Sequence, residues 1–288
     1  MLFALLFIFL YARSCFDTKN NELQVQSGQT LQYCLSEANC MHLATSGIFD
    51  SVVEFANSFG ESSFSNTQHS RIGTGIISQL CKVSEEMCKE LVYRGALSTM
   101  LKCCRSIDTE TQRNSAIALS NFALFGGPEN HAAMIKHKIP EWLLFVGCSP
   151  DDHVCYNGCL AIVALASNKE IESYILKQST LNHVAHFMAK HSARQFAANP
   201  LARSYGQSKA WLKKLVSVLD SDREEAKSLA AFHFAMIAHQ RKGQKSVSVS
   251  IEYTRWLCKV AFRYLAKSVQ LMLFAVWPAH RMPLHPNM

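Results

Sequence analysis

Apolar residues recur every three or four positions along most of this chain, which is the spacing of amphipathic helices. The clearest runs are residues 22–40, 71–82, 110–125, 154–166 and 209–219, with short segments rich in Gly, Pro, Ser and Asn between them. No stretch alternates apolar and polar residues as a half-buried strand would. The pattern therefore predicts an all-α protein.

Start and stop signals divide these runs. Ser84 and Asp108 stand before helical segments as N-cap residues, and Gly126-Gly127-Pro128 ends the helix of 110–125. The interval 191–208 interrupts the periodicity, and we expect an irregular loop there, as on solenoid faces that carry a binding function. The other expected helices are 48–59, 84–92, 96–105, 129–137, 140–147, 168–177, 180–190, 221–240 and a weaker candidate at 250–277.

One motif returns along the chain. The segment 116–123 (Ala-Ile-Ala-Leu-Ser-Asn-Phe-Ala) has relatives at 75–81 and 160–166, and aligning Gln79, Asn121 and Ala164 gives spacings of 42 and 43 residues. Helical repeats of this length are typical of armadillo and HEAT proteins. We therefore expect a right-handed superhelical solenoid, whose function lies on its concave surface or at its ends.

A generic armadillo scaffold that binds extended peptides is the alternative function. Such grooves usually carry asparagine at equivalent positions of successive repeats. Here asparagine stands at one of the three aligned positions, Asn121, with Gln79 and Ala164 at the others. The sequence therefore favours a different use of the groove, and Asn121 is expected to serve in packing.

Composition narrows the class of partner. The 288 residues are 49% hydrophobic and 18% charged, which is ample for a core and too apolar for a disordered chain. The net charge of +7 is scattered, so nucleic acid is not an expected partner. A local group of basic residues could form an anion-binding patch, but a solvated face fits the charge pattern better. The group consists of Arg71, Lys82, Arg94, Lys102 and Arg105.

The candidate chemistry of this chain is sparse. Its 11 cysteines are odd in number and include no Cys-x-x-Cys, so we expect reduced thiols in a cytoplasmic compartment and no metal site. Phosphate-binding, dinucleotide-binding and hydrolase motifs are missing, so we expect no catalytic residues.

The apolar stretch 1–10 has no preceding positive charge, and it is too short to span a bilayer, which needs roughly 20 residues. It could be a secretory signal, a short membrane anchor or a mispredicted first exon, and we expect residues 1–21 to lie outside the folded domain.

Several segments together resemble one family, the sterile-alpha-and-TIR-motif (SARM) NAD hydrolases. The resemblance is collinear from residue 22 to 247, while 1–21 and 248–288 differ from the family. The matching stretches include Ser84–Val92, Ala116–Asn121, Ala123–Gly127, Cys159–Glu170 and Leu215–Ser221. The combination is more specific than an armadillo repeat alone. It implies that 22–247 is an armadillo-repeat domain.

The resemblance also implies a function. In that family the armadillo region inhibits a C-terminal TIR domain that cleaves NAD, and sterile alpha motif domains assemble the rings. The proteins act in axon degeneration and innate-immune signalling, in the cytoplasm and at mitochondria or neurites. We therefore expect a non-catalytic regulatory region that senses NAD or nicotinamide mononucleotide (NMN) as an allosteric ligand. Its expected partners are the TIR and sterile alpha motif domains of full-length members, in hetero-oligomers.

Five residues follow from the resemblance as a nucleotide site. Lys82 matches a phosphate-contacting lysine, and Gln79 stands where the family often has histidine. Tyr33 and Leu35 lie on the helix that lines the nucleotide, and Gly206 lies in the loop that closes over it. Two departures weaken this pocket: Cys40 stands where a phosphate-binding arginine is expected, and no tryptophan-bearing helix precedes residue 22.

Overall fold

The computed structural model describes residues 16, 18–61, 66–176, 181–206 and 208–241, and within these ranges every regular element is a helix. The all-α prediction is confirmed. The expected helix at 250–277 and the apolar leader lie outside the described residues. The α-helices are α2 (Asn21–Cys34), α3 (Glu37–Ala44), α4 (Phe49–Glu61), α5 (Thr67–Leu80), α6 (Glu85–Tyr93), α7 (Ala96–Cys103), α8 (Thr109–Phe125), α9 (Gly127–Lys136), α10 (Ile139–Gly147), α11 (Asp152–Ala166), α12 (Glu172–Leu176), α13 (Leu181–Lys190), α14 (Ala193–Ala198), α15 (Lys209–Leu219) and α16 (Glu224–Arg241), with a 3-10 helix, η2 (Pro200–Ser204).

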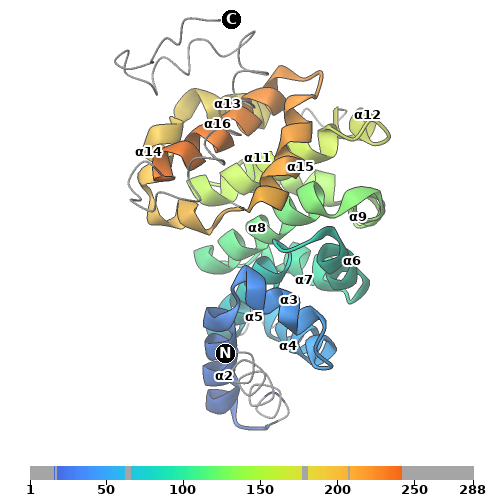
Figure 1. The fold of residues 1–288 in the computed structure, drawn as a ribbon, viewed down its shortest axis with the longest axis vertical. Coiled ribbons are helices and arrows are strands. Elements are labelled where there is room, and N and C mark those ends of the chain that lie inside the picture. The colour runs from blue at the N-terminus through green and yellow to red at the C-terminus, as the bar shows by residue number, and fades with distance from the viewer. Residues whose placement is uncertain (1–15, 17, 62–65, 177–180, 207, 242–288) are drawn as a thin grey trace, which may run out of the picture.

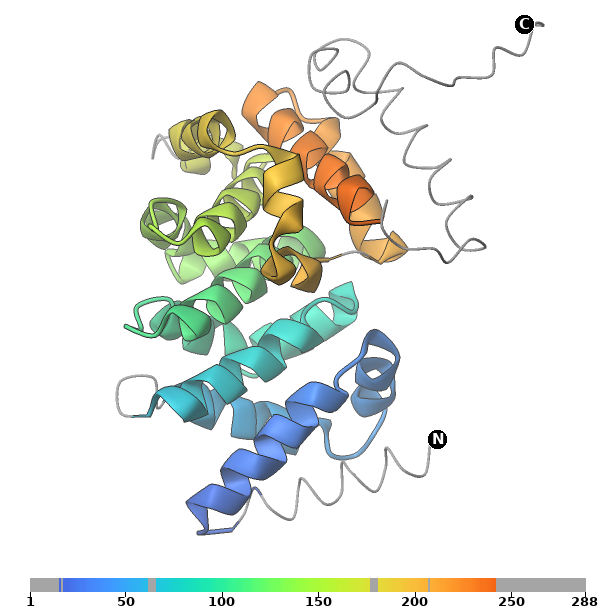
Figure 2. The same cartoon turned by 90° about the vertical axis from the view of Figure 1, so that its left-hand side faces the viewer.

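The helices stack along the long axis of the molecule, from α2 at one end to α13–α16 at the other (Figure 1). A central series of helices carries the stack, because α2 packs on α5, α5 on α8, α8 on α11 and α11 on α16. Figure 2 shows these helices in successive layers. One continuous apolar core runs through the layers, as expected of a solenoid whose repeats cannot bury their faces alone.

Three N-caps fix the register of the repeat. The side chains of Asn66, Asp108 and Asp151 accept hydrogen bonds from backbone N–H groups in the first turns of α5, α8 and α11. The caps are 42 and 43 residues apart, so Gln79, Asn121 and Ala164 occupy the same position of successive helices. The alignment made from the sequence is therefore confirmed.

Arginines join two of these caps, Asp108 and Asp151, to the preceding repeat. Arg71 of α5 binds Asp108 through Nε and Nη2 of its guanidinium at 2.5–3.0 Å, and Arg113 of α8 binds Asp151 through the same two nitrogens at 2.6–3.2 Å. The hydrogen bonds from Arg71 are the largest cause that lowers the pKa of Asp108, to about 2. Bidentate pairs of this kind also fix orientation, so they set how one repeat meets the next.

Two segments differ from the expectation. The predicted helix 22–40 is two helices, since α2 ends at Cys34 and Ser36 caps α3 by accepting from the N–H of Asn39. The interval 191–208 is not an irregular loop, because it contains α14 and η2. Ser192 caps α14, and Pro200 ends that helix and begins η2.

Gly73 lies where α4 and α5 approach each other closely, so a substitution there tests this contact. A Cβ at this position would meet the carbonyl oxygen of Ala56 and stand 2.6 Å from the backbone nitrogen of Gly60. Backbone cannot move aside as a side chain can, so we expect Gly73→Ala to lower the free energy of unfolding by about 1–3 kcal/mol. Alanine would otherwise add about 1 kcal/mol of helix stability. Urea denaturation measures the difference.

Gly47→Ala is the matched control, because a Cβ there would have nothing within 4 Å. We expect it to be close to neutral. If Gly73→Ala proved as stable as Gly47→Ala, the two helices would not approach as closely as described.

Candidate functional site

Lys82 and Gln79 come together just after α5. The chain turns there, and the Lys82 ammonium donates to the side-chain oxygen of Gln79 at 3.2 Å. Lys82 keeps some solvent access, yet burial of its charged end lowers its pKa, with the Cys40 and Cys81 thiols as neighbours. Burial raises the pKa of the Cys40 thiol to about 12, so this neighbour is neutral at physiological pH. The result is a partly desolvated cation, which an anion in the same place would stabilise.

Asn121 occupies the position of Gln79 one repeat later. Only 2% of it is exposed, and its side chain donates to the carbonyl of Ile117 at 2.7 Å. Its amide oxygen accepts from the indole N–H of Trp211 at 2.6 Å. Asn121 is therefore used in packing, as expected, and it is not presented to a peptide in the groove.

Gly206 is the end of the segment predicted to close over the ligand. Its carbonyl accepts from Nε2 of His233 at 3.1 Å, and a Cβ on Gly206 would collide with the Trp211 ring. Nδ1 of His233 then accepts from the hydroxyl of Tyr156, so His233 is a neutral, doubly bonded imidazole. Burial lowers its pKa to about 4. These contacts attach the segment to α11, α15 and α16.

A chain of contacts connects the two halves of the predicted site. Cys81 precedes Lys82 and lies beside the Asn121 amide, Asn121 holds Trp211, and Trp211 packs against Gly206. The structure thus brings Gln79 and Lys82 into direct contact and joins them to Gly206 through Asn121 and Trp211. No sequence signal pointed to this connection, because Asn121 and Trp211 are 90 residues apart.

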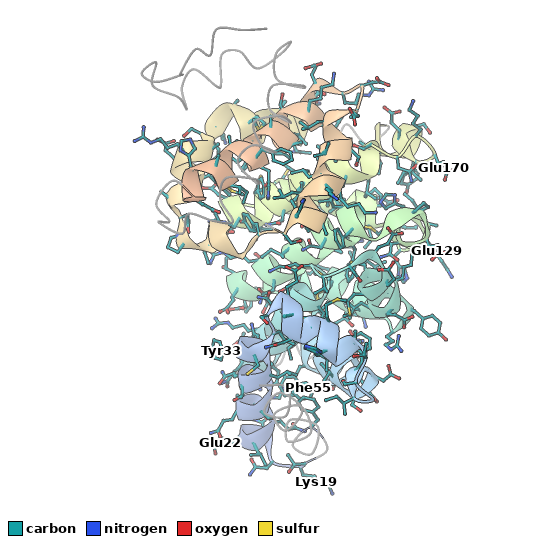
Figure 3. The ribbon with its side chains drawn as sticks, viewed as in Figure 1. Lys19, Glu22, Tyr33, Phe55, Glu129 and Glu170 are labelled. Carbon is teal, nitrogen blue, oxygen red and sulfur yellow. The ribbon has the colours of Figure 1, made fainter. Side chains whose placement is uncertain are left out.

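The two α2 residues of the predicted site differ from each other. Tyr33 lies near the C-terminal end of α2 with 89% of its surface exposed (Figure 3). Leu35, at the C-cap of α2, is buried in the core. Leu35 therefore contributes packing beneath this end of the helix, whereas Tyr33 is accessible. Their contact with a nucleotide stays a prediction.

The other basic residues of the expected group do not converge on an anion site. Arg71 pairs with Asp108, Arg94 with Asp50 and Glu90, and Lys102 with Glu61, while the Arg105 guanidinium lies 4.9 Å from the centre of the Trp142 ring. Each has its own partner on a different part of the surface. Three of these residues form ion pairs and Arg105 lies over an aromatic ring, so they fit the expected solvated face and not a shared anion site.

Within the described ranges, no group of three or more His, Cys, Asp or Glu side chains is arranged to hold a metal ion. Among the helices described, none has both the length and the apolar character needed to cross a bilayer.

The sequence is similar to a set of curated NAD(+) hydrolases. It is 44% identical over 228 residues to NAD(+) hydrolase sarm1 of Drosophila melanogaster, covering 79% of this chain and 16% of that protein. It is 34% identical to SARM1 of Danio rerio, covering 64% and 26%, and 28% identical to tir-1 of Caenorhabditis elegans, covering 80% and 23%. The chain thus matches about a quarter or less of the length of these relatives. No protein-family model matches it.

Solved structures with the same arrangement are armadillo repeat proteins. A designed armadillo repeat protein aligns with a TM-score of 0.57 at 17% identity, covering 79% of this chain and 98% of that one. A computationally designed armadillo protein for modular peptide recognition aligns with a TM-score of 0.56 at 14% identity, covering 88% and 98%. At these identities the likeness shows the fold alone, and it confirms the armadillo-type solenoid.

Proposed function

Because this chain is an armadillo region homologous to part of the SARM NAD(+) hydrolases, we propose that it is a regulatory region that binds NAD or NMN. The curated relatives carry NAD(+) hydrolase in their names and are much longer than the part matched here. We assign no catalytic residue to this region. Its role is to bind the nucleotide and to hold back the TIR domain, with the TIR and sterile alpha motif domains of full-length members as partners.

The observation that carries the proposal is Lys82. Its ammonium is partly withdrawn from water beside a neutral amide, and burial lowers its pKa. A dinucleotide or mononucleotide phosphate placed there would form a charge-assisted hydrogen bond and offset the cost of burying the cation. Gln79 would remain within reach of the ligand as a neutral hydrogen-bonding group, without titrating as a histidine does.

Regulation then follows from differential affinity. A ligand shifts a two-state equilibrium only as far as it binds one state more tightly than the other. A nucleotide that contacts Lys82 on one side and the Gly206 segment on the other would favour the arrangement in which the two are held together. A competing nucleotide that fails to make both contacts would release it.

Calorimetric titration with NAD and with NMN tests the ligand. We expect Lys82→Ala to weaken binding by about 10- to 100-fold, since hydrogen bonds to charged groups are worth about 1.5–3 kcal/mol. Lys136→Ala removes the same charge from an exposed position at the end of α9 and is expected to leave binding unchanged. A folded chain that releases no heat with either nucleotide, or equal losses in both variants, would rule out the site.

Catalysis by this region is measured separately. Incubated alone with NAD, the chain is expected to produce no nicotinamide. Added to a full-length relative, it is expected to reduce nicotinamide release. Turnover by the chain alone would overturn its assignment as a regulatory region.

A further inference from the structure

A hollow lies between α3, α4 and α6, and none of the residues of the proposed nucleotide site lines it. Its volume is about 530 Å³, and it is formed by the end of α3, the turn before α4, the first turn of α4, and α6 from its N-cap Ser84 to its C-cap Arg94. A space of this size is sufficient for two or three side chains of a docked segment. It is therefore a separate candidate for binding.

Carboxylates dominate the charged groups in this hollow. Asp50, Glu86 and Glu90 line it together with a single cation, Arg94. Arg94 binds both Asp50 and Glu90, and its guanidinium lies 5.3 Å from the centre of the Phe49 ring. Two negative charges thus remain in excess, in a chain whose net charge is +7. This local reversal of sign attracts cations and repels anions.

The rest of the lining is largely apolar. Met41 is 51% exposed at the hollow, and Phe49 and Met87 form buried parts of its wall. Methionine side chains adapt to differently shaped apolar partners at low cost. An apolar floor with a rim of carboxylates is complementary to a segment that carries both an apolar side chain and a cation.

We propose that this hollow, between α3, α4 and α6, docks a protein segment in which an arginine or lysine stands next to a large apolar residue. The apolar side chain covers Met41 and Met87. The cation meets Glu86, which projects from the first turn of α6. Arg94 already forms ion pairs with Asp50 and Glu90. Glu86 is therefore the carboxylate that contributes most to the affinity for the incoming cation.

Short capped peptides serve as probes. The acetylated and amidated tripeptide Leu-Arg-Leu is titrated into isotopically labelled protein at low salt, and NMR shifts report both affinity and the residues contacted. Leu-Gln-Leu has the same apolar groups without the charge. We expect Leu-Arg-Leu to bind more tightly and to shift the resonances of Met41, Met87 and Glu86.

Two charge-reversal variants distinguish the effect of a carboxylate in this hollow from the effect of the protein's net charge on peptide binding. Glu86→Lys is expected to weaken Leu-Arg-Leu binding by about fivefold, the effect of about 1 kcal/mol at an exposed ion pair. Glu54→Lys makes the same change at an exposed position on α4 outside the hollow, and we expect less than a twofold effect. Salt should weaken binding to the unmodified protein and not to Glu86→Lys.

Four results of these titrations would overturn the proposal. They are the absence of any binding, equal affinity for Leu-Gln-Leu and Leu-Arg-Leu, equal effects of Glu86→Lys and Glu54→Lys, and shifts confined to other helices. A concentration-dependent dimer in sedimentation that Glu86→Lys dissociates would identify a second copy of this chain as the occupant, against the proposal. Because Lys82 is not involved, failure here leaves the nucleotide site untouched, and the converse also holds.

Discussion

Replacing Trp211 with alanine is expected to lower the free energy of unfolding by about 3–5 kcal/mol, the range for removing a large buried aromatic side chain. Trp211 is 2% exposed, and its ring lies 4.7 Å from that of His233, centre to centre. The substitution would also leave the amide oxygen of Asn121 without its indole donor. Urea denaturation followed by far-UV circular dichroism measures the loss.

Two further variants distinguish the loss of the indole hydrogen bond from the loss of buried aromatic surface. Trp211→Phe keeps a ring but removes the N–H, so an unsatisfied buried oxygen on Asn121 should cost about 1–3 kcal/mol. Trp142→Ala removes a tryptophan that is only half-buried and lies under Arg105, and we expect a clearly smaller loss. Equal losses at Trp211 and Trp142 would mean that the Gly206 segment is not held by Trp211.

Acid is expected to destabilise the protein through His233. Its pKa is about 4 in the folded chain against 6.5 for the unfolded residue. Above pH 6.5 both states are neutral at this site, so its contribution is fully present. As the pH falls from 6.5 to 4 the unfolded chain takes up the proton and the folded chain does not, so stability decreases by up to about 3 kcal/mol. Burial lowers the pKa of His131 and His153 as well, which adds in the same direction.

Urea denaturation at pH 7.5, 6.0 and 5.0 tests this expectation. The slope of stability against pH, and not the stability itself, is the measure, because His233→Gln also loses hydrogen bonds. We expect His233→Gln to flatten the slope and the exposed His137→Gln to leave it unchanged. An unchanged slope in His233→Gln would show that His233 does not stay neutral in the folded chain.

The repeat could be predicted because its signals are local. Ser84 and Asp108 are N-cap residues that can be recognised in the sequence, and the motif around Asn121 recurs at a regular spacing. The break of 22–40 was missed because Ser36 lies within continuous apolar periodicity, although its side chain caps α3. The helices within 191–208 are not predictable from Asn199-Pro200, because such a pair is typical of a loop, whereas here it separates two short helices.

The candidate site was less accessible to sequence reasoning. Gln79 and Lys82 are three residues apart at the end of a helix, so periodicity already brings them close. The links from Asn121 to Trp211 and from Tyr156 to His233 join positions 90 and 77 residues apart. They depend on how the last helices turn back over the stack, which no local pattern encodes.

The shared carboxylates Asp108 and Asp151 also make the solenoid cooperative. Each of them caps its own helix and also pairs with an arginine from the equivalent helix of the preceding repeat, so neither role is complete in an isolated repeat. The stability of a repeat array is the sum of the stabilities of the single repeats and of the interfaces between neighbours. A residue that caps one helix and pairs with the preceding repeat contributes to the interface term, and less to the stability of a single repeat. The segment from α5 to α11 should therefore open as one unit in hydrogen exchange, with its protection lost together and not helix by helix.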